Sequence, residues 1–404
     1  MKPPYIKDFE KLGFGIFVHF GLFSLLGKGE WFYKNGRSKE VKSYFTDEFA
    51  NKFNPKKDWA IKIVKKAKKI GAKYITLTTK HHEGYCLYDS KGLTNWDCMN
   101  LGPKRDLVKE FVDACNQEGI VPFFYHALLD WHHEDYQNNF PKYIDYLNNS
   151  IEILCKNYGK IGGFWFDGFW DKPNENWQFD RLYELIRKYQ PTAMIINNTG
   201  LSATGEVSHY EIDSVTFERG KPFVVSSSDG KERAGEMCEV FGEHWGYAKD
   251  DINFKPISEI INSLLECRYC NCNFLLNVGP KGDGSLRDLD KCYLDAIGYW
   301  IRRNKNFIYN VKRANLEMEN AYVLQDDKYF YAIIKNVPMS SDVNVQLGHE
   351  MPTIKLKEYK IMNATYLDIG ERVTLNEDKS SFKLNPFFYG SALSTRVVRF
   401  KIKK

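Results

Sequence analysis

A single carboxylate ends an apolar run near the middle of the chain, where residues 162–166 (GGFWF) lead into Asp167 and Gly168. The run predicts a buried strand whose carboxyl end presents Asp167, and barrel enzymes place their reacting groups at that end. Neighbouring aromatic residues, Trp165 among them, suit a sugar, because rings cover its C–H faces while an anion approaches the anomeric carbon. The alternative is an aspartate that only caps the following turn.

Other apolar runs also end in polar or aromatic side chains. His81 and His82 follow the second run, and they would point to opposite sides if the strand continued through them. A metal site built from the histidines is the competing hypothesis, and it would need several ligands to converge. Repeated polar strand ends indicate one shared site more strongly than any single residue does. The other strand ends and the loops beyond them hold His19, Glu30, Trp31, Tyr125, His126, Asn197, Asn198, Glu218, Glu236 and Trp245.

Short β-type runs alternate with helix-type segments over the first three quarters of the chain. The clearest helical segments are 58–69, 106–117, 142–158 and 179–189, which begin at or near polar residues and end near glycine or proline. This alternation predicts a parallel sheet covered by helices, and about eight strands predict a closed (β/α)8-like barrel. The pattern is weaker in the later half, so we expect an irregular barrel. The predicted strands are 16–20, 74–79, 121–126, 163–166, 193–197, 214–217, 237–241 and 274–278.

The pattern changes after residue 312. Segments 329–334, 353–356 and 397–402 are short and partly alternating, with turn residues between them and no helical period. They predict a small antiparallel β-sandwich without obvious chemistry of its own. We therefore expect a catalytic barrel domain over residues 1–312 and a β-sandwich domain over residues 313–404.

The bulk composition excludes several classes of protein. The net charge of +5 is spread along the chain, so no nucleic-acid partner is expected, and no run approaches the ~18 apolar residues of a membrane helix. No apolar signal segment is visible at the start, which favours a cytoplasmic protein unless a secreted chain has been trimmed. Nine cysteines without framework spacing predict reduced thiols. A zinc site at Cys267, Cys270 and Cys272 would lack a second Cys/His pair, and association into a homo-oligomer stays open.

Several blocks of the chain resemble the α-L-fucosidases of glycoside hydrolase family 29. The first are 14–24 followed by Glu30 and Trp31, and 71–85, which ends in KHHEGY. The others are 128–133 (LLDWHH), 165–168 (WFDG), 245–247 (WGY) and 273–280 (NFLLNVGP). The blocks keep the family order over roughly residues 10–285, and together they are very specific although each is short.

The resemblance implies a retaining exo-glycosidase that acts on fucosylated glycans without a cofactor, with a barrel followed by a β-sandwich. Asp167 falls on the family's nucleophile. His126 departs from the pattern, because the family often has two tyrosines where Tyr125 and His126 stand. The residues that the resemblance assigns to substrate binding are His19, Glu30, Trp31, His81, His82, Tyr125, His126, Trp165 and Trp245.

The acid/base is the least determined residue, because the family does not hold it in one strict motif. Glu218 is the favoured candidate, since Thr216-x-Glu218 lies about fifty residues after the nucleophile, as in several members. Glu236 matches another block and is the second candidate, whereas Glu218 could instead form an ion pair with Arg219. Two other functions stay open, a metal-dependent barrel hydrolase that uses the histidines and a non-catalytic fucose-binding protein.

Overall fold

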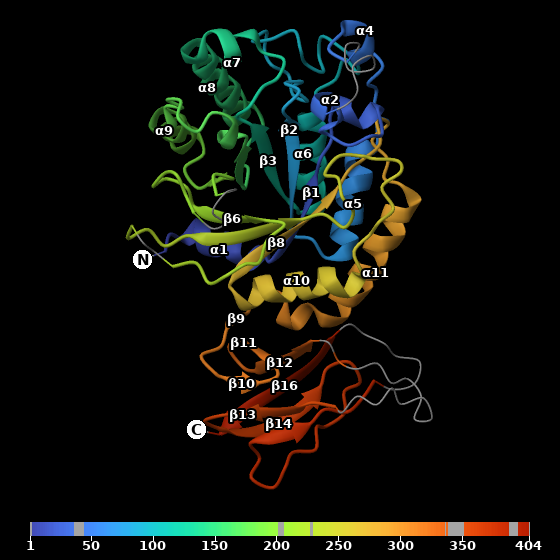
Figure 1. Ribbon diagram of the computed structural model, residues 1–404, viewed down its shortest axis with the longest axis vertical. Coiled ribbons are helices and arrows are strands. Elements are labelled where there is room, and N and C mark those ends of the chain that lie inside the picture. Colours follow the sequence, from blue (N-terminus) through green and yellow to red (C-terminus); the bar gives the residue numbers. More distant parts are fainter. Residues whose placement is uncertain are drawn as a thin grey trace.

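The computed structural model describes residues 2–35, 44–200, 206–226, 229–335, 337, 351–387 and 395–403. Within this part of the chain, parallel strands β1 to β8 close into a barrel in chain order (Figure 1). Two antiparallel sheets follow after the barrel. The predicted fold class, a (β/α)8-like barrel followed by an antiparallel β unit, is therefore confirmed.

The predicted barrel strands are present, but several have shifted ends. The first begins at Phe14 and stops before His19, and the seventh begins at Ala234 rather than at Met237. The apolar pattern does not predict the start of the seventh strand, because this part of the strand carries Glu236, a buried polar residue that interrupts the pattern. The bounds are β1 (Phe14–Val18), β2 (Tyr74–Lys80), β3 (Val121–Ala127), β4 (Gly163–Asp167), β5 (Met194–Asn197), β6 (Ser214–Glu218), β7 (Ala234–Glu239) and β8 (Cys272–Val278).

Amphipathic helices cover the strands of the first half. Helix α5 buries Ile63, Val64 and Ala67 and ends at Gly71, whose φ of 105° is costly for other residues. The four predicted helices correspond to α5 (Trp59–Ile70), α6 (Leu107–Glu118), α8 (Phe140–Asn157) and α9 (Phe179–Tyr189). Additional helices are α2 (Phe32–Asn35), α4 (Asp47–Ala50), α7 (Glu134–Asn138), α10 (Ile257–Tyr269) and α11 (Asp288–Asn304). None of the helices in the described ranges is long and apolar enough to cross a membrane.

The barrel is irregular between β5 and β7. The described parts of the β5–β6 and β6–β7 connections contain no helix, so loops replace the usual outer cover there. Strands β5 and β6 also pair in register only at Ile196 and Ser214. The irregularity that the weak second half of the sequence predicts is thus concentrated at one seam of the barrel.

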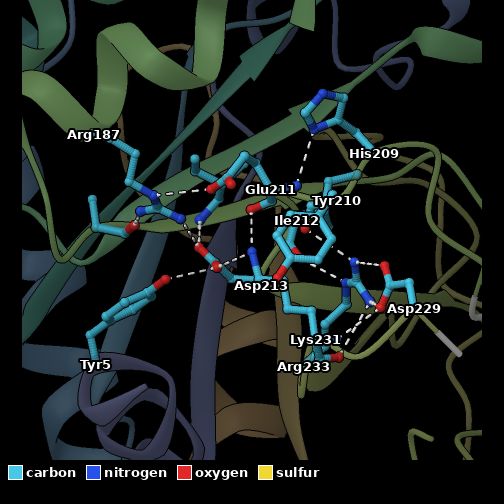
Figure 2. Close-up of polar contacts among 12 residues, drawn as sticks. Tyr5, Arg187, His209, Tyr210, Glu211, Ile212, Asp213, Asp229, Lys231 and Arg233 are labelled. Carbon is cyan, nitrogen blue, oxygen red and sulfur yellow. Dashed lines mark hydrogen bonds and ion pairs between the residues drawn. The ribbon is translucent and has the colours of Figure 1, made fainter. Parts of the chain in front are cut away.

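A buried polar network reinforces that seam (Figure 2). Asp213 stands just before β6, and its Oδ2 accepts hydrogen bonds from Ile195 N at 2.8 Å and Arg187 Nη2 at 2.5 Å. Its Oδ1 accepts from Tyr5 Oη at 3.0 Å and lies 3.0 Å from Lys231 Nζ. Side chains from α9, from the N-terminal helix and from the β6–β7 loop therefore hold β6 where backbone pairing is sparse.

Helix α1 (Pro4–Leu12) closes the barrel at the amino ends of the strands. Its buried Ile6 and Phe9 belong to the interior cluster of the barrel, where the Phe9 ring lies 5.7 Å from Tyr74 and 5.6 Å from Phe123. Because this end is filled by apolar side chains, the carboxyl ends of the strands form the accessible mouth of the barrel.

The C-terminal unit packs two sheets on one another around a core that includes Ile354 and Phe382 from one sheet and Ile361 and Phe400 from the other. It rests on helix α10, where the Tyr322 and Tyr269 rings stack with centroids 4.4 Å apart (Figure 1). One sheet has the order β10 (Met318–Glu319), β13 (Thr353–Leu356), β15 (Ser381–Lys383), and the other β14 (Lys360–Tyr366), β16 (Thr395–Lys403), β12 (Phe330–Lys335), β11 (Tyr322–Gln325), β9 (Lys312–Arg313).

Candidate active site

A pocket of about 220 Å³ opens at the carboxyl ends of the barrel strands. Aromatic and titratable side chains dominate its lining, which is the composition expected of a polar ligand with apolar faces. A larger hollow of about 490 Å³ lies beside α5, but it is bordered by lysines and aspartates that pair with one another, such as Lys56 and Asp283. The smaller pocket is lined by Phe17, His19, Trp31, His81, His82, Tyr125, Trp165, Asp167, Trp170, Glu218, Cys238 and Trp245.

Asp167 is the last residue of β4 and faces the pocket together with Trp165. Tyr125 Oη donates a hydrogen bond to Asp167 Oδ2 at 3.0 Å, and His82 Nε2 lies 3.5 Å from the same oxygen. Burial opposes ionisation of Asp167, but the contacts with His82 and Tyr125 outweigh it and lower the pKa. Asp167 is therefore held as a carboxylate at neutral pH.

Glu218 ends β6 and faces the same pocket. Asn198 Nδ2 donates to Glu218 Oε2 at 2.7 Å and to Asp167 Oδ1 at 3.3 Å, so these two oxygens are no farther apart than the sum of the two distances. Burial, with a smaller contribution from the charge of Asp167, raises the pKa of Glu218 to about 7. The pocket thus holds one ionised carboxylate and one carboxyl group that keeps its proton near neutral pH.

Three of the four predicted histidines, His19, His81 and His82, line the pocket together. The ring centroids of His81 and His82 lie 4.4 Å apart, so the two side chains do not diverge as they would in a strand that continued through them. The strand ends at Lys80, and the alternation of a strand no longer applies beyond it. Burial lowers the pKa of His19 and His81 well below the usual range, which leaves both rings neutral and able to donate or accept hydrogen bonds.

Glu30 lies beside the pocket but is not among the residues that line it. Its Oε2 accepts a hydrogen bond from Gly246 N at 2.7 Å, while Asn277 Nδ2 donates to Trp245 O at 2.6 Å. The two contacts fix the loop that brings the Trp245 ring to 5.1 Å from His19. The geometry therefore gives Glu30 a positioning role, and direct contact with a substrate stays a prediction.

His126 and Glu236 do not line the pocket. The side chain of His126 turns outward, because it alternates with the inward Tyr125, and its Nδ1 lies 3.3 Å from Thr79 Oγ1. Glu236 lies inside the barrel, where it accepts hydrogen bonds from Tyr74 Oη and from Trp165 Nε1, the latter at 2.9 Å. The predicted substrate contact of His126 finds no support in this geometry, and Glu236 lacks direct access to a ligand in the pocket.

A metal site built from the histidines is the competing hypothesis for this pocket. Among the described residues, no group of three or more His, Cys, Asp or Glu side chains is placed to hold a metal ion. The thiols of Cys270 and Cys272 point to different partners, Pro222 O at 3.5 Å and Phe223 O at 3.7 Å. The cysteine-rich segment therefore packs against the β6–β7 loop.

The family model described as Alpha-L-fucosidase matches residues 2–306 of the chain. The chain belongs to the alpha-L-fucosidase family. Membership makes the protein a glycoside hydrolase, as the resemblance of its motifs implied. It is 28% identical to the tissue alpha-L-fucosidase of Macaca fascicularis over 394 residues, which covers 89% of this chain and 81% of that relative.

Solved structures agree with this family membership. The alpha-L-fucosidase isoenzyme 1 of Paenibacillus thiaminolyticus matches with a TM-score of 0.84 and 29% identity, over 99% of both chains. An alpha-L-fucosidase of Bacteroides thetaiotaomicron, solved as a trapped covalent intermediate with a fluorinated fucosyl compound, matches with a TM-score of 0.82 and 25% identity, over 100% of this chain and 97% of that one.

Several pocket residues of this family member received no role from the sequence. Asn198 was recognised only as a polar strand end, and Trp170 only as a neighbour of Asp167. Phe17 and Cys238 were not considered, although strand alternation could have found both: Phe17 stands two residues before His19, and Cys238 pairs in register with Glu218.

Proposed function

We propose that the protein is a retaining exo-α-L-fucosidase that removes terminal α-L-fucosyl residues from glycans, with Asp167 as nucleophile and Glu218 as acid/base. One observation carries the proposal: two carboxyl groups face a single small pocket, joined by one amide, and their pKa values are displaced in opposite directions. A pair of this kind can supply an attacking anion and a proton donor at the same pH.

In the first step, a carboxylate oxygen of Asp167 attacks the anomeric carbon and forms a fucosyl ester. The bond from that carbon to the leaving oxygen breaks, and the leaving oxygen takes the proton of Glu218. Retaining pairs stand about 5–5.5 Å apart. The two hydrogen bonds of Asn198 hold the bonded oxygens of Asp167 and Glu218 no farther apart than the sum of 2.7 Å and 3.3 Å, which is compatible with such a pair.

In the second step, the ionised Glu218 takes a proton from water while the water oxygen attacks the anomeric carbon. The ester bond breaks, Asp167 is again a carboxylate, and the sugar leaves with its original anomeric configuration. Glu218 recovers its proton in this step, so the two residues return to their starting states without a cofactor.

The lining of the pocket suits a single deoxy-sugar ring. Its volume of about 220 Å³ is below the ~300–1,000 Å³ of pockets for drug-sized ligands, which favours one terminal ring over an internal chain segment. Neutral His19 and His81 can hydrogen-bond hydroxyl groups. The rings of Trp31, Trp165 and Trp245 offer apolar surface to C–H groups and to the methyl group of fucose.

Hydrolysis of p-nitrophenyl α-L-fucoside, measured beside the β-D-galactoside and with and without EDTA, tests the proposal. We expect release from the fucoside only, unchanged by EDTA, with the α-anomer of fucose appearing first in the proton NMR spectrum. Release of the β-anomer would contradict retention. Loss of activity with EDTA would point to a metal, and binding of fucose without turnover of any fucoside would indicate a binding protein.

A further inference from the structure

Within the described part of the chain, the amide of Asn198 is the only side chain that donates hydrogen bonds to both pocket carboxylates. Its Nδ2 donates to Glu218 Oε2 at 2.7 Å and to Asp167 Oδ1 at 3.3 Å. Asn198 is 2% exposed, so water offers little competition for these bonds. An amide nitrogen carries two hydrogens, one for each carboxylate, and both are used here.

The orientation of this amide is fixed by a hydrogen bond to its oxygen, on the side away from the two carboxyl groups. Thr216 Oγ1 donates to Asn198 Oδ1 at 2.7 Å, and Thr216 lies on the same side of β6 as Glu218, two residues before it. A rotated amide would turn its oxygen toward two carboxyl groups and its nitrogen toward the threonine. The backbone of Asn198 is anchored as well, because its N–H donates to Phe166 O at 2.9 Å, next to Asp167.

The position of Asn198 also matters. It follows β5, so it stands at the seam where β5 and β6 pair in register only at Ile196 and Ser214. Asp167 lies on the β4 side of this seam and Glu218 on the β6 side. At the mouth of the barrel, the Asn198 amide therefore links Asp167 and Glu218 across this seam. Backbone hydrogen bonds do least there to fix the spacing of the two carboxyl groups.

We propose that Asn198, oriented by Thr216, is a positioning residue that couples the two carboxyl groups and sets their spacing across the β5–β6 seam. The kinetic consequences of this inference rest on the proposed function. The hydrogen bonds that join the two carboxyl groups do not depend on it. The amide does not react. It acts by holding Glu218 toward the leaving oxygen and Asp167 toward the anomeric carbon, and by stabilising the ionised form of each.

Removal of the amide has a distinctive electrostatic consequence. A hydrogen bond to a carboxylate lowers its pKa, so loss of the Asn198 donors raises the pKa of both Asp167 and Glu218. Both limbs of the pH profile of kcat/KM then move to higher pH, whereas general structural damage lowers the plateau and leaves the limbs in place. The other titratable groups that face the pair are His19, His81, His82, Tyr125, Glu30, Arg219 and Cys238, and the substitution leaves all of them unchanged.

The test compares Asn198→Leu with Asn197→Leu. Leucine has the same number of heavy atoms and the same branching as asparagine, but its methyl groups form no hydrogen bonds and leave no room for a replacing water. Asn197 is the matched control, because it is the adjacent asparagine and the last residue of β5, but its amide donates to Tyr183 Oη at 2.8 Å, away from the pocket. For Asn198→Leu we expect both limbs to rise by about one pH unit and kcat/KM on a poor leaving group to fall about a hundredfold. For a dinitrophenyl fucoside, whose leaving group needs little acid assistance, kcat/KM should fall less.

A second pair of variants separates positioning from folding. Thr216→Val removes the hydroxyl that orients the amide, and Thr216→Ser keeps it. We expect a smaller shift of the same sign in the valine variant and unchanged limbs in the serine variant. The pKa values of the two groups are also measured by carboxyl carbon-13 NMR titration, assigned with Asp167→Asn and Glu218→Gln.

The two readouts keep the inference distinct from the proposed function. If wild-type protein hydrolyses no fucoside but the NMR pKa values rise in Asn198→Leu, the proposed function fails and the coupling stands. If neither the limbs nor the NMR pKa values move in a folded Asn198→Leu or Thr216→Val protein, the inference is overturned. Equal shifts in Asn197→Leu would overturn it as well.

Discussion

The two sides of the barrel hold their functional groups in different ways. On the covered side, β4 pairs with β3 from Gly163 to Asp167, and helices α8 and α9 flank it in the chain. On the other side, β6 follows a loop, precedes a loop and pairs in register with β5 only at Ser214. Asp167 belongs to the first region and Glu218 to the second. The backbone alone can position Asp167, whereas Glu218 depends on additional contacts between side chains.

Two such contacts cross the sparse seam, one at each end of β6. Asp213 binds Ile195 N before the strand, and Asn198 binds Glu218 after it. The pairing of β6 with β7 is regular, from Ser214 to Glu218, so backbone hydrogen bonds fix β6 to β7 along its whole length but to β5 only sparsely. A few side chains can therefore set the spacing of two carboxyl groups where the barrel scaffold is interrupted.

The largest expected effect is that of Asp167→Gly, which removes the group held by the covered side. We expect kcat/KM to fall by at least about a thousandfold on every α-L-fucoside, because the only other carboxyl group of the described pocket lining, Glu218, serves as the proton donor and cannot replace the nucleophile. The free energy of unfolding, followed by circular dichroism, should change little. Substantial remaining activity in purified Asp167→Gly protein would contradict the role of nucleophile.

Glu218→Gln tests the group on the other side. Glutamine keeps the shape and can still accept a hydrogen bond from Asn198, but it has no proton to donate. We expect a loss of about 10²–10⁴-fold on fucosides with poor leaving groups and a much smaller loss in the first step with dinitrophenyl fucoside. An equal loss on both substrates would mean that Glu218 is not the general acid.

The Asp213 network gives the next prediction, on stability. Asp213→Asn leaves the cations of Arg187 and Lys231 facing a neutral side chain in a buried place, so we expect the free energy of unfolding to fall by about 3 kcal/mol. Denaturant unfolding measures this value. Asp145→Asn is the control, because its ion pair with Arg181 is exposed and should change stability by less than about 1 kcal/mol.

The activity of the Asp213→Asn variant shows whether the network also affects the position of Glu218. If the seam sets the position of Glu218, the folded fraction of Asp213→Asn should lose more activity on a poor leaving group than on dinitrophenyl fucoside. An equal loss on both would mean that the network only stabilises the barrel and does not reach the site.

The sequence predicted the covered side of the barrel better than the open side, for a physical reason. Helices such as α5 and α9 show their apolar period directly in the sequence, and the run before Asp167 is apolar throughout. On the open side, the described residues between β5 and β7 form no helix whose period could be recognised, and strand β7 carries the buried Glu236 and Glu239. Family motifs found the histidines of the pocket, but the link through Asn198 depends on a contact between strands that spacing along the chain does not reveal.

Single residues show a related limit. His81 and His82 would diverge only in a strand that continued through them, and because the strand ends at Lys80 its alternation does not separate the two side chains. The substrate contact assigned to His126 does not allow for the alternation with Tyr125, which turns its ring outward. Both cases concern side-chain direction, which depends on where a strand ends and on which face is inside.

The pH dependence follows from the two displaced pKa values. Catalysis needs Glu218 protonated, and burial raises its pKa to about 7, so kcat/KM should fall as the pH rises through about 7. It also needs Asp167 ionised, and because the pKa of Asp167 is lowered, activity should persist until well below pH 4 if the fold survives. A rate profile from acid to pH 9 checks this, and a basic limb near the ordinary glutamate value would contradict the raised pKa.

The smallest effect is expected for Glu236→Gln, which separates the two candidates for the acid. Burial raises the pKa of Glu236 to about 7 as well, so titration alone does not distinguish it from Glu218. Geometry does, because Glu236 accepts hydrogen bonds from Tyr74 and Trp165 inside the barrel, and glutamine can still accept one of them through its oxygen. We expect kcat/KM to change by less than about tenfold and the basic limb of the pH profile to stay in place, while the free energy of unfolding falls by about 1–2 kcal/mol. If instead Glu236→Gln removed the basic limb and its loss depended on the leaving group, the acid would lie under the pocket floor, and Trp165 would have to move aside for the proton to reach the substrate.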